Sequence, residues 1–170
     1  MLNDLYLPDY KRLTTMYVGS PGSGKSFHVR NTLLEFSIRN EDPDLRILYC
    51  CPKQEMDLGE KTLVDISKLE KHMSENRLSV VYPDPMNLEM EVDYLIDFIF
   101  DVRDANPDFK CVFVCDDSQI FLSSRKAASP SWKRLALTGR SRGIRLVSIS
   151  HTPVFSKELE GSTSYIVHFR

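Results

Sequence analysis

The segment LTTMYVGSPGSGKS, residues 13–26, decides the fold of this chain. Its first six residues form a short β-prone run, and the remainder fits the spacing G-x-x-x-x-G-K-[ST] at Gly19, Gly24, Lys25 and Ser26. An amphipathic helical pattern follows the motif. A strand, a glycine-rich turn and a helix in this order predict a loop that wraps the phosphates of a nucleotide.

The chemistry of a triphosphate explains these residue types. Its clustered negative charges need backbone N–H donors, which glycines bring close because they adopt φ and ψ angles that other residues avoid. We expect Lys25 to place its ammonium on the β and γ phosphates and the Ser26 hydroxyl to be a ligand of Mg²⁺, with the positive end of the helix dipole adding to the attraction. The predicted nucleotide-binding residues are Gly19, Ser20, Pro21, Gly22, Ser23, Gly24, Lys25, Ser26 and Phe27.

Length and composition predict one domain with a short leading arm. The chain has 170 residues, of which 42% are hydrophobic and 27% charged, which is ordinary for a globular protein. We expect residues 1–12 to form an N-terminal arm and residues 13–170 to form a single phosphate-loop domain. Because no apolar run approaches the ~20 residues of a membrane span and the N-terminus lacks the features of a signal peptide, we expect a cytoplasmic location.

The cysteines are Cys50, Cys51, Cys111 and Cys115, all in segments with the pattern of buried strands. Their spacings do not match the convergent thiolate pairs of a zinc site. We therefore predict that they are reduced residues of the core.

The net charge of −2 hides an uneven distribution. Residues 1–117 hold 13 Lys and Arg against 22 Asp and Glu, whereas residues 118–156 hold 7 basic residues and no acidic one. A block of one sign in a nearly neutral domain points to a local anionic partner, although a solvated basic face has the same composition. The basic residues of this block are Arg125, Lys126, Lys133, Arg134, Arg140, Arg142 and Arg145.

Hydrophobic patterning predicts an α/β fold in which a mostly parallel sheet is flanked by helices. Continuous apolar runs predict strands covered on both faces, and longer segments with helical spacing predict helices. Their alternation over short connections favours parallel pairing. We predict strands at residues 13–18, 46–51, 78–82, 110–115, 145–149 and 164–169, and helices at residues 25–40, 62–73, 87–104 and 132–137, the third capped by Asn87.

The strand at residues 110–115 ends in two acids, Asp116 and Asp117. Because the carboxyl ends of parallel strands meet at one edge of a sheet, this pair should face the phosphate loop. We expect Asp116 to hold Mg²⁺ through water and Asp117 to orient or deprotonate the attacking water. Two adjacent acids favour hydrolysis over simple binding, although an Asp-Asp turn after a strand is the plain alternative.

The segment GRSRGIRLVSISHTP, residues 139–153, is the second distinctive stretch. It combines a small-residue turn bearing arginines, an apolar strand, and a polar residue at the tip followed by proline. We expect His151 to lie level with Asp116 and to sense the γ-phosphate, the alternative being a loop histidine. Arg140 and Arg142 lie where one subunit could offer a guanidinium to the nucleotide of a neighbour, the alternative being surface salt bridges.

The order of phosphate loop, apolar strand with Asp116-Asp117, and Gly-Arg-x-x-Gly-Ile strand segment resembles the FtsK/HerA superfamily of ring-forming, DNA-pumping ATPases. The small size is most similar to the viral branch, the genome-packaging ATPases. The resemblance covers residues 13–169. Two positions depart from the pattern, because many members carry Glu where this chain has Asp117 and often Gln where it has His151.

The resemblance implies a function and a set of partners. It implies ATP and Mg²⁺ as cofactors and an ATP-hydrolysing DNA translocase that pumps double-stranded viral DNA into a capsid as a homo-oligomeric ring, a pentamer or hexamer. A pore loop at residues 123–129 would grip DNA phosphates through Arg125 and Lys126. Capsid vertex or portal proteins would be further partners, in the host cytoplasm or at the virion vertex.

The resemblance also implies roles for individual residues. The implied catalytic residues are Lys25, Asp117, Arg140, Arg142 and His151, and the implied metal-binding residues are Ser26 and Asp116.

Two other functions stay open at this point. A small P-loop nucleotide kinase would use Lys25, Ser26 and Asp116 in the same way, although the sequence has no Arg-rich lid after an acceptor helix. A nucleotide-gated phage assembly or export factor would be expected to carry a transmembrane segment, which the sequence does not show. The ATPase rate with and without double-stranded DNA, together with the size in solution, distinguishes these functions.

Overall fold

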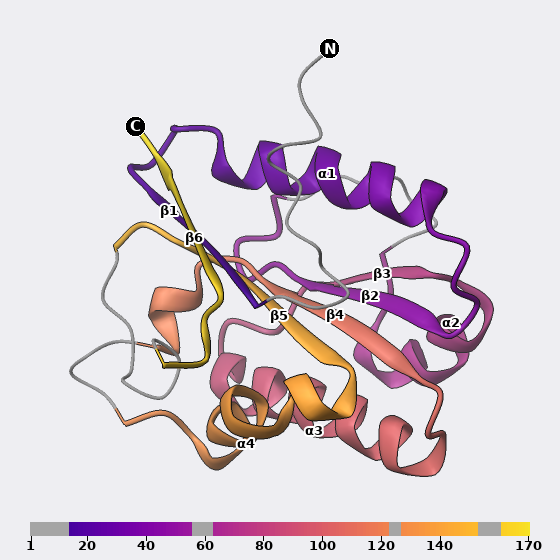
Figure 1. Cartoon of the computed structure of the whole chain (residues 1–170). Helices are drawn as coiled ribbons and strands as arrows, with labels where there is room; N and C mark the ends of the chain where they lie inside the picture. Colours follow the sequence, from indigo (N-terminus) through magenta and orange to yellow (C-terminus); the bar gives the residue numbers. More distant parts are fainter. Residues whose placement is uncertain (1–13, 56–62, 123–126, 153–160) are drawn as a thin grey trace.

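The computed structural model contains a parallel β-sheet with helices on both faces (Figure 1). It describes residues 14–55, 63–122, 127–152 and 161–170. The strand order in the 6-stranded sheet is β3-β2-β4-β5-β1-β6, and each neighbouring pair is parallel. This confirms the predicted α/β architecture.

The elements alternate along the chain as the sequence predicts. The strands are β1 (Thr15–Gly19), β2 (Leu45–Cys50), β3 (Leu78–Val81), β4 (Lys110–Cys115), β5 (Ile144–Ser150) and β6 (Tyr165–Phe169). The α-helices are α1 (Lys25–Arg39), α2 (Leu69–Glu75), α3 (Leu88–Ala105) and α4 (Pro130–Thr138), and the 3₁₀ turns are η2 (Ile66–Lys68), η3 (Ser118–Ile120) and η4 (Arg140–Arg142). No helix among these described residues is both long and apolar enough to span a membrane.

The second helix differs from its prediction at residues 62–73. Leu63 is extended and forms a parallel bridge with Val80, and the helical turns begin only at Ile66. Asp65 explains the delay, because its side chain accepts a hydrogen bond of 2.8 Å from the backbone N–H of Ser67 and caps the turn. Residue 62 and the predicted arm at residues 1–12 lie outside the described residues.

The predicted cap of α3 is also corrected. Asn87 occupies the N-cap position, but its side chain makes no capping hydrogen bond there. Its amide instead donates to the Asp84 carboxylate at 3.0 Å. The first turn still gains from the acids Glu89 and Glu91, which complement the positive end of the helix dipole.

The two faces of the sheet have separate apolar cores. Helix α1 covers one face, and α2, α3 and α4 cover the other (Figure 1). In β2, Ile47 and Tyr49 belong to the core on the α1 side, whereas Leu48 and Cys50 belong to the opposite core. Because successive side chains of a strand point to opposite faces, a strand covered on both sides must be continuously apolar.

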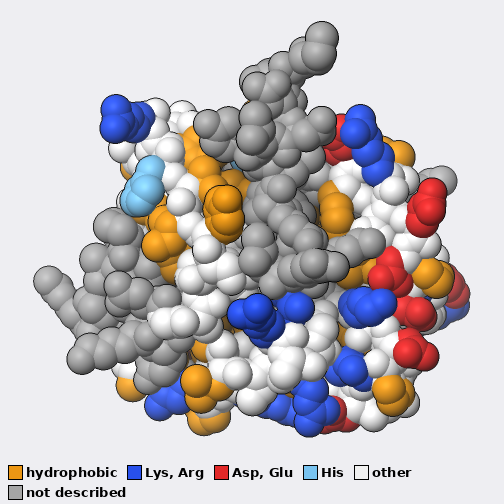
Figure 2. Space-filling model, viewed as in Figure 1, with side chains coloured by type: hydrophobic (Ala, Val, Ile, Leu, Met, Phe, Trp, Pro, Cys, Tyr) orange, Lys and Arg blue, Asp and Glu red, His pale blue; other side chains and the backbone are white. Residues whose placement is uncertain are grey.

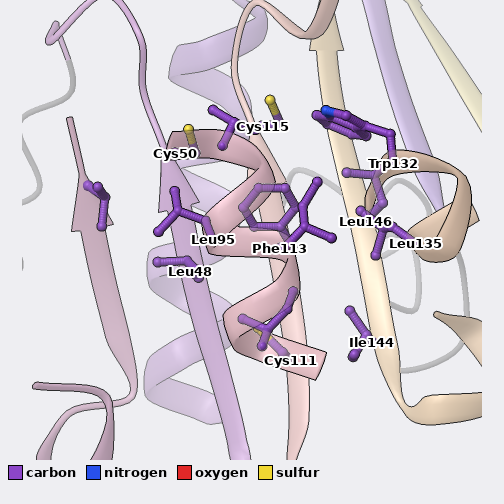
Figure 3. Packing of buried hydrophobic residues seen from close by; sticks show 14 of the residues in the cluster. Leu48, Cys50, Leu95, Cys111, Phe113, Cys115, Trp132, Leu135, Ile144 and Leu146 are labelled. Atoms are coloured by element: carbon purple, nitrogen blue, oxygen red, sulfur yellow. The ribbon is translucent and has the colours of Figure 1, made fainter. Parts of the chain in front are cut away.

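Aromatic residues and cysteines fill the core under α3 and α4 (Figure 3). The ring of Trp132 lies 6.2 Å from that of Phe113 and 5.9 Å from that of Phe121, measured between centroids. The cysteines are buried, as predicted, and burial raises the pKa of the Cys111 thiol to about 12. Such thiols behave as small apolar residues rather than as nucleophiles.

Because the strands are parallel, one edge of the sheet carries the carboxyl ends of the strands and the opposite edge carries their amino ends. All carboxyl ends lie at one edge, so the turn after β1, the acids after β4 and His151 after β5 come together there. The turn η4 precedes β5 and therefore lies at the opposite edge. This geometry decides which predicted residues can share one site.

The packing of α3 gives a stability prediction. Leu95 is fully buried (0% exposed) against the sheet, so Leu95→Ala should lower the free energy of unfolding by about 2–5 kcal/mol. Met90 on the same helix is 67% exposed, so Met90→Ala should change it by less than about 0.5 kcal/mol. Urea unfolding followed by circular dichroism measures both variants. Equal losses of the free energy of unfolding in the two variants would contradict the burial of Leu95 against the sheet.

Candidate functional site

The loop between β1 and α1 has the backbone geometry of a phosphate cradle. Gly22 and Gly24 adopt positive φ angles of 77° and 88°, which favour glycine. A Cβ atom on Gly19 would lie 2.5 Å from the carbonyl oxygen of Phe169, so this position excludes any side chain. The first N–H groups of α1 have no acceptors within the helix and open toward the loop. Such a concave set of donors suits an anion.

Lys25 carries a buried ammonium group within this loop. The residue is only 3% exposed, and Nζ donates to the carbonyl oxygens of Gly19 at 2.7 Å and Ser20 at 2.8 Å. Among the described residues no carboxylate lies within ion-pair distance of Nζ. Burial lowers the pKa of Lys25, although the charges of the nearby aspartates oppose this effect. A buried cation with neutral acceptors is stabilised by an anion, so the position fits a phosphate group.

Asp116, directly after β4, is a buried carboxylate with polar but uncharged donors. It accepts hydrogen bonds from the Tyr49 hydroxyl at 3.1 Å, from the Ser26 hydroxyl at 3.4 Å and from the backbone N–H of Asp117 at 2.9 Å. Burial, followed by the charge of Asp117, raises the pKa of Asp116. A cation beside Asp116 would relieve this cost, since it favours the ionised form.

The Ser26 and Asp116 oxygens fit a magnesium ion. A hydroxyl and a carboxylate are the oxygen ligands that Mg²⁺ prefers. No cluster of three or more His, Cys, Asp or Glu side chains that could hold a metal occurs in the described part of the chain. These residues therefore fit an ion that takes few protein ligands and fills its other positions with phosphate and water oxygens.

Three donors hold the Asp117 carboxylate in place. Oδ2 accepts from Lys53 Nζ at 2.9 Å, and Oδ1 accepts from His151 Nε2 and Gln119 Nε2, each at 2.9 Å. The backbone of Asp117 adopts φ 49°, an unusual conformation that is typical of functional positions and that Asp tolerates. Because a carboxylate has about four acceptor positions, the three donors among the described residues leave one position for a water molecule.

A cavity of about 220 Å³ brings Ser26, Asp116 and Asp117 into one site, next to the loop that holds Lys25. It lies between the start of α1 and the carboxyl ends of β2, β4 and β5. The lining residues are Ser26, Phe27, Arg30, Cys51, Lys53, Glu55, Asp116, Asp117 and His151. Residues proposed from three separate segments of sequence thus lie together.

The predicted arginines do not join this cavity. Arg140 and Arg142 belong to η4, on the far side of β5, and a strand of that length spans roughly 20 Å. The Arg142 guanidinium pairs with Asp104, whereas that of Arg140 is exposed and has no partner among the described residues. Neither arginine can reach the phosphate loop of its own chain. Arg125 and Lys126 lie outside the described residues.

Sequence reasoning missed Cys51 and Glu55, which line the cavity, and four further polar residues of the site. Lys53 and Gln119 contact Asp117, Tyr49 contacts Asp116, and Arg30 lines the cavity from α1. Lys53 could have been found, because it follows β2, whose end pairs with the end of β4 and must lie at the same edge. The other three carry no pattern that separates them from ordinary polar residues.

The raised pKa of Asp116 gives a stability prediction with a definite sign. A carboxyl whose pKa is higher in the folded chain destabilises the fold above that pKa and has no such effect below its unfolded value of 3.8. Asp116→Asn should therefore raise the free energy of unfolding at neutral pH, and the gain should vanish as the pH falls through the folded pKa toward 3.8.

Thermal unfolding between about pH 4 and about pH 8 measures this difference. Asp108→Asn, at an exposed position, is the control and should show no such gain. A loss of stability in Asp116→Asn at neutral pH would contradict the assignment of Asp116 as a buried, uncompensated carboxylate.

Similar proteins were found by comparison with solved structures, and not by comparison of sequences. No protein-family model matches the sequence, and no curated protein matches it significantly. The genome-packaging NTPase B204 of Sulfolobus turreted icosahedral virus 2, solved with ATP-gammaS, is 12% identical over 94% of this chain and 74% of its own length, with a TM-score of 0.69. B204 of Sulfolobus turreted icosahedral virus, described as a DNA-packaging ATPase, is 13% identical over 92% of this chain and 75% of its own, with a TM-score of 0.68.

A more distant similarity is to the N-terminal domain of zonular occludens toxin from Neisseria meningitidis. It is 15% identical over 92% of this chain and 76% of its own length, with a TM-score of 0.53. The predicted resemblance to FtsK/HerA-like packaging ATPases is therefore confirmed at the level of the fold, which this chain shares with viral genome-packaging NTPases.

Proposed function

We propose that this protein is an ATP-hydrolysing motor that translocates double-stranded DNA, as the packaging ATPase of a virus. The observation that carries the proposal is the buried pair Asp116 and Asp117 beside the phosphate loop, with Asp117 held by three donors among the described residues. A protein that only binds nucleotide gains nothing from a second buried carboxylate. A hydrolase gains a group that orients water and accepts its proton.

Each residue of the site has a role in this proposal. Lys25 and the loop N–H groups bind the β and γ phosphates, and Ser26 and Asp116 hold Mg²⁺, which neutralises phosphate charge when it is bound. Asp117 aligns the attacking water and takes its proton. His151 lies 2.9 Å from Asp117 and 3.3 Å from Lys25, a position from which it can sense the γ-phosphate.

The coupling to DNA is supported by similarity and by charge. B204, which has the same fold, is described as a DNA-packaging ATPase. Figure 2 shows Lys and Arg side chains across the lower part of the face, over the region in which Figure 1 places α4 and the start of β5. These charges suit DNA phosphates. Within the proposal, Arg125 and Lys126 contact DNA, and capsid vertex or portal proteins dock the motor in the host cytoplasm or at the virion vertex.

A ring of identical subunits, a pentamer or hexamer, would complete the site. The arginines of η4 cannot reach the phosphate loop of their own chain. An arginine finger, which is a guanidinium that contacts the phosphates bound by a neighbouring subunit, would therefore have to come from η4 of a second copy. We assign this role to Arg140. Its guanidinium is exposed and unpaired among the described residues, whereas Arg142 is tied to Asp104.

The first test combines ATPase rate with size in solution. The protein should hydrolyse ATP faster when double-stranded DNA is added, and it should form a ring with a non-hydrolysable ATP analogue, because the trans arginine needs a neighbour. Lys25→Ala should lose hydrolysis and serves as the inactive control. A dilute monomer that cleaves ATP fully without DNA would refute the motor, and transfer of phosphate to a nucleotide instead of water would favour a kinase.

The second test separates the two arginines. Arg140→Ala should lower the ATPase rate by about 10³-fold or more while nucleotide binding persists, because a finger acts on the charge of the transition state. Arg142→Ala should have a small effect, since its ion pair with Asp104 is exposed. Mixing Arg140→Ala with Lys25→Ala subunits should restore part of the activity. Full activity in Arg140→Ala would remove the assignment.

A further inference from the structure

Lys53 lies where it can control the orientation of Asp117. It follows β2, and its Nζ reaches across the sheet edge to Asp117 Oδ2 at 2.9 Å, after the end of β4. The Asp117 side chain is only 4% exposed, whereas that of Lys53 is 47% exposed at the cavity wall. The hydrogen bond to Asp117 raises the pKa of Lys53, so the group is charged at neutral pH. Among the described residues, Lys53 is the lysine or arginine that pairs directly with this buried carboxylate.

His151 completes the arrangement from the other side. Its Nε2 lies 2.9 Å from Asp117 Oδ1, and its Nδ1 lies 3.3 Å from Lys25 Nζ. Because a carboxylate only accepts and an ammonium only donates, both contacts are satisfied when Nε2 carries the proton and Nδ1 does not. Lys53 Nζ, which is 3.3 Å from Nε2, is then a second donor converging on the same carboxylate.

We propose that Lys53 is a positioning residue for Asp117, which it clamps together with His151 so that the free acceptor position of the carboxylate faces the attacking water. The proposal rests on the hydrolytic role of Asp117 proposed above. The clamp also connects the end of β2 to the phosphate-binding lysine through the series Lys53, Asp117, His151 and Lys25. A misplaced base is costly, since shifts of about 1 Å in a reacting group reduce rates by ~10²-fold.

The test is the variant Lys53→Met, which keeps the length of the side chain and removes its charge and donors. We expect kcat for ATP to fall by about 10- to 100-fold. The dissociation constant of a fluorescent, non-hydrolysable ATP analogue should change far less, because the site for the phosphates is unaltered. Lys53→Arg should recover part of kcat, since it retains a charged donor, and Lys53→Gln should recover less.

Lys110 provides a matched control. Its Nζ pairs with Asp42 Oδ2 at the same 2.9 Å, and its side chain is 48% exposed, compared with 47% for Lys53. Lys110 begins β4, so this pair lies at the opposite edge of the sheet from the cavity. Lys110→Met should therefore keep the kcat of the original protein. A general effect of losing one Lys–Asp pair would lower both rates alike.

A double variant separates positioning from mere stability. In an Asp117→Asn background, Lys53→Met should cause no further loss of rate, because Lys53 acts through Asp117. An additional loss there, or a kcat in Lys53→Met equal to that of Lys110→Met, would overturn the proposal. A loss of affinity for the ATP analogue as large as the loss of kcat would also overturn it. If Lys53→Met does not fold, Lys53→Arg and Lys53→Gln replace it in the test. The proposal then requires a higher kcat for Lys53→Arg than for Lys53→Gln, and equal values would overturn it.

The outcome for Asp117→Asn alone distinguishes this inference from the proposed function. If Asp117→Asn keeps full ATPase activity, hydrolysis through Asp117 is wrong and the clamp falls with it. If Asp117→Asn is inactive while Lys53→Met is fully active, the hydrolytic site stands and only the role of Lys53 is refuted.

Discussion

The candidate site depends on two buried groups of opposite charge, Lys25 and Asp116, whose direct hydrogen-bond partners are neutral. Lys25 and Asp116 are both nearly inaccessible to water, yet neutral groups provide their direct hydrogen bonds. Burying charges in this way costs free energy, which the apolar cores on both faces of the sheet must offset. The charges that remain uncompensated are complementary to a magnesium ion and a phosphate chain. Under the proposed function, the site is thus preorganised for its ligand at the expense of stability.

Asp117 is treated differently from its neighbour, although the two acids are adjacent in sequence. Its carboxylate is held by Lys53, His151 and Gln119, and its backbone adopts the left-handed conformation. One acid therefore retains the features of a metal ligand, and the other those of a positioned base. The difference arises from the partners that each side chain meets, which come from α1, from β2 and the residues after it, from η3 and from the end of β5.

The unlike edges of a parallel sheet divide the proposed functions between two surfaces. The carboxyl edge holds the phosphate loop, both acids and His151, whereas the arginines of η4 lie at the amino edge. One chain cannot bring these surfaces together, because the length of β5 separates them. In a ring, the amino edge of one copy can face the carboxyl edge of the next. If the proposed function holds, hydrolysis depends on assembly, because the site of each copy is completed by its neighbour.

The sequence by itself determined the layout of strands and helices, the parallel sheet and the phosphate loop, because these follow from apolar periodicity and from glycines at fixed spacing. It also placed Asp116, Asp117 and His151 at one edge, since each follows an apolar strand. Only the tertiary structure decided that Lys53, Tyr49 and Gln119 contact the acids, and that α2 begins late, after Asp65. Such contacts join side chains far apart in the chain, and their lengths and rotamers depend on packing that no local pattern encodes.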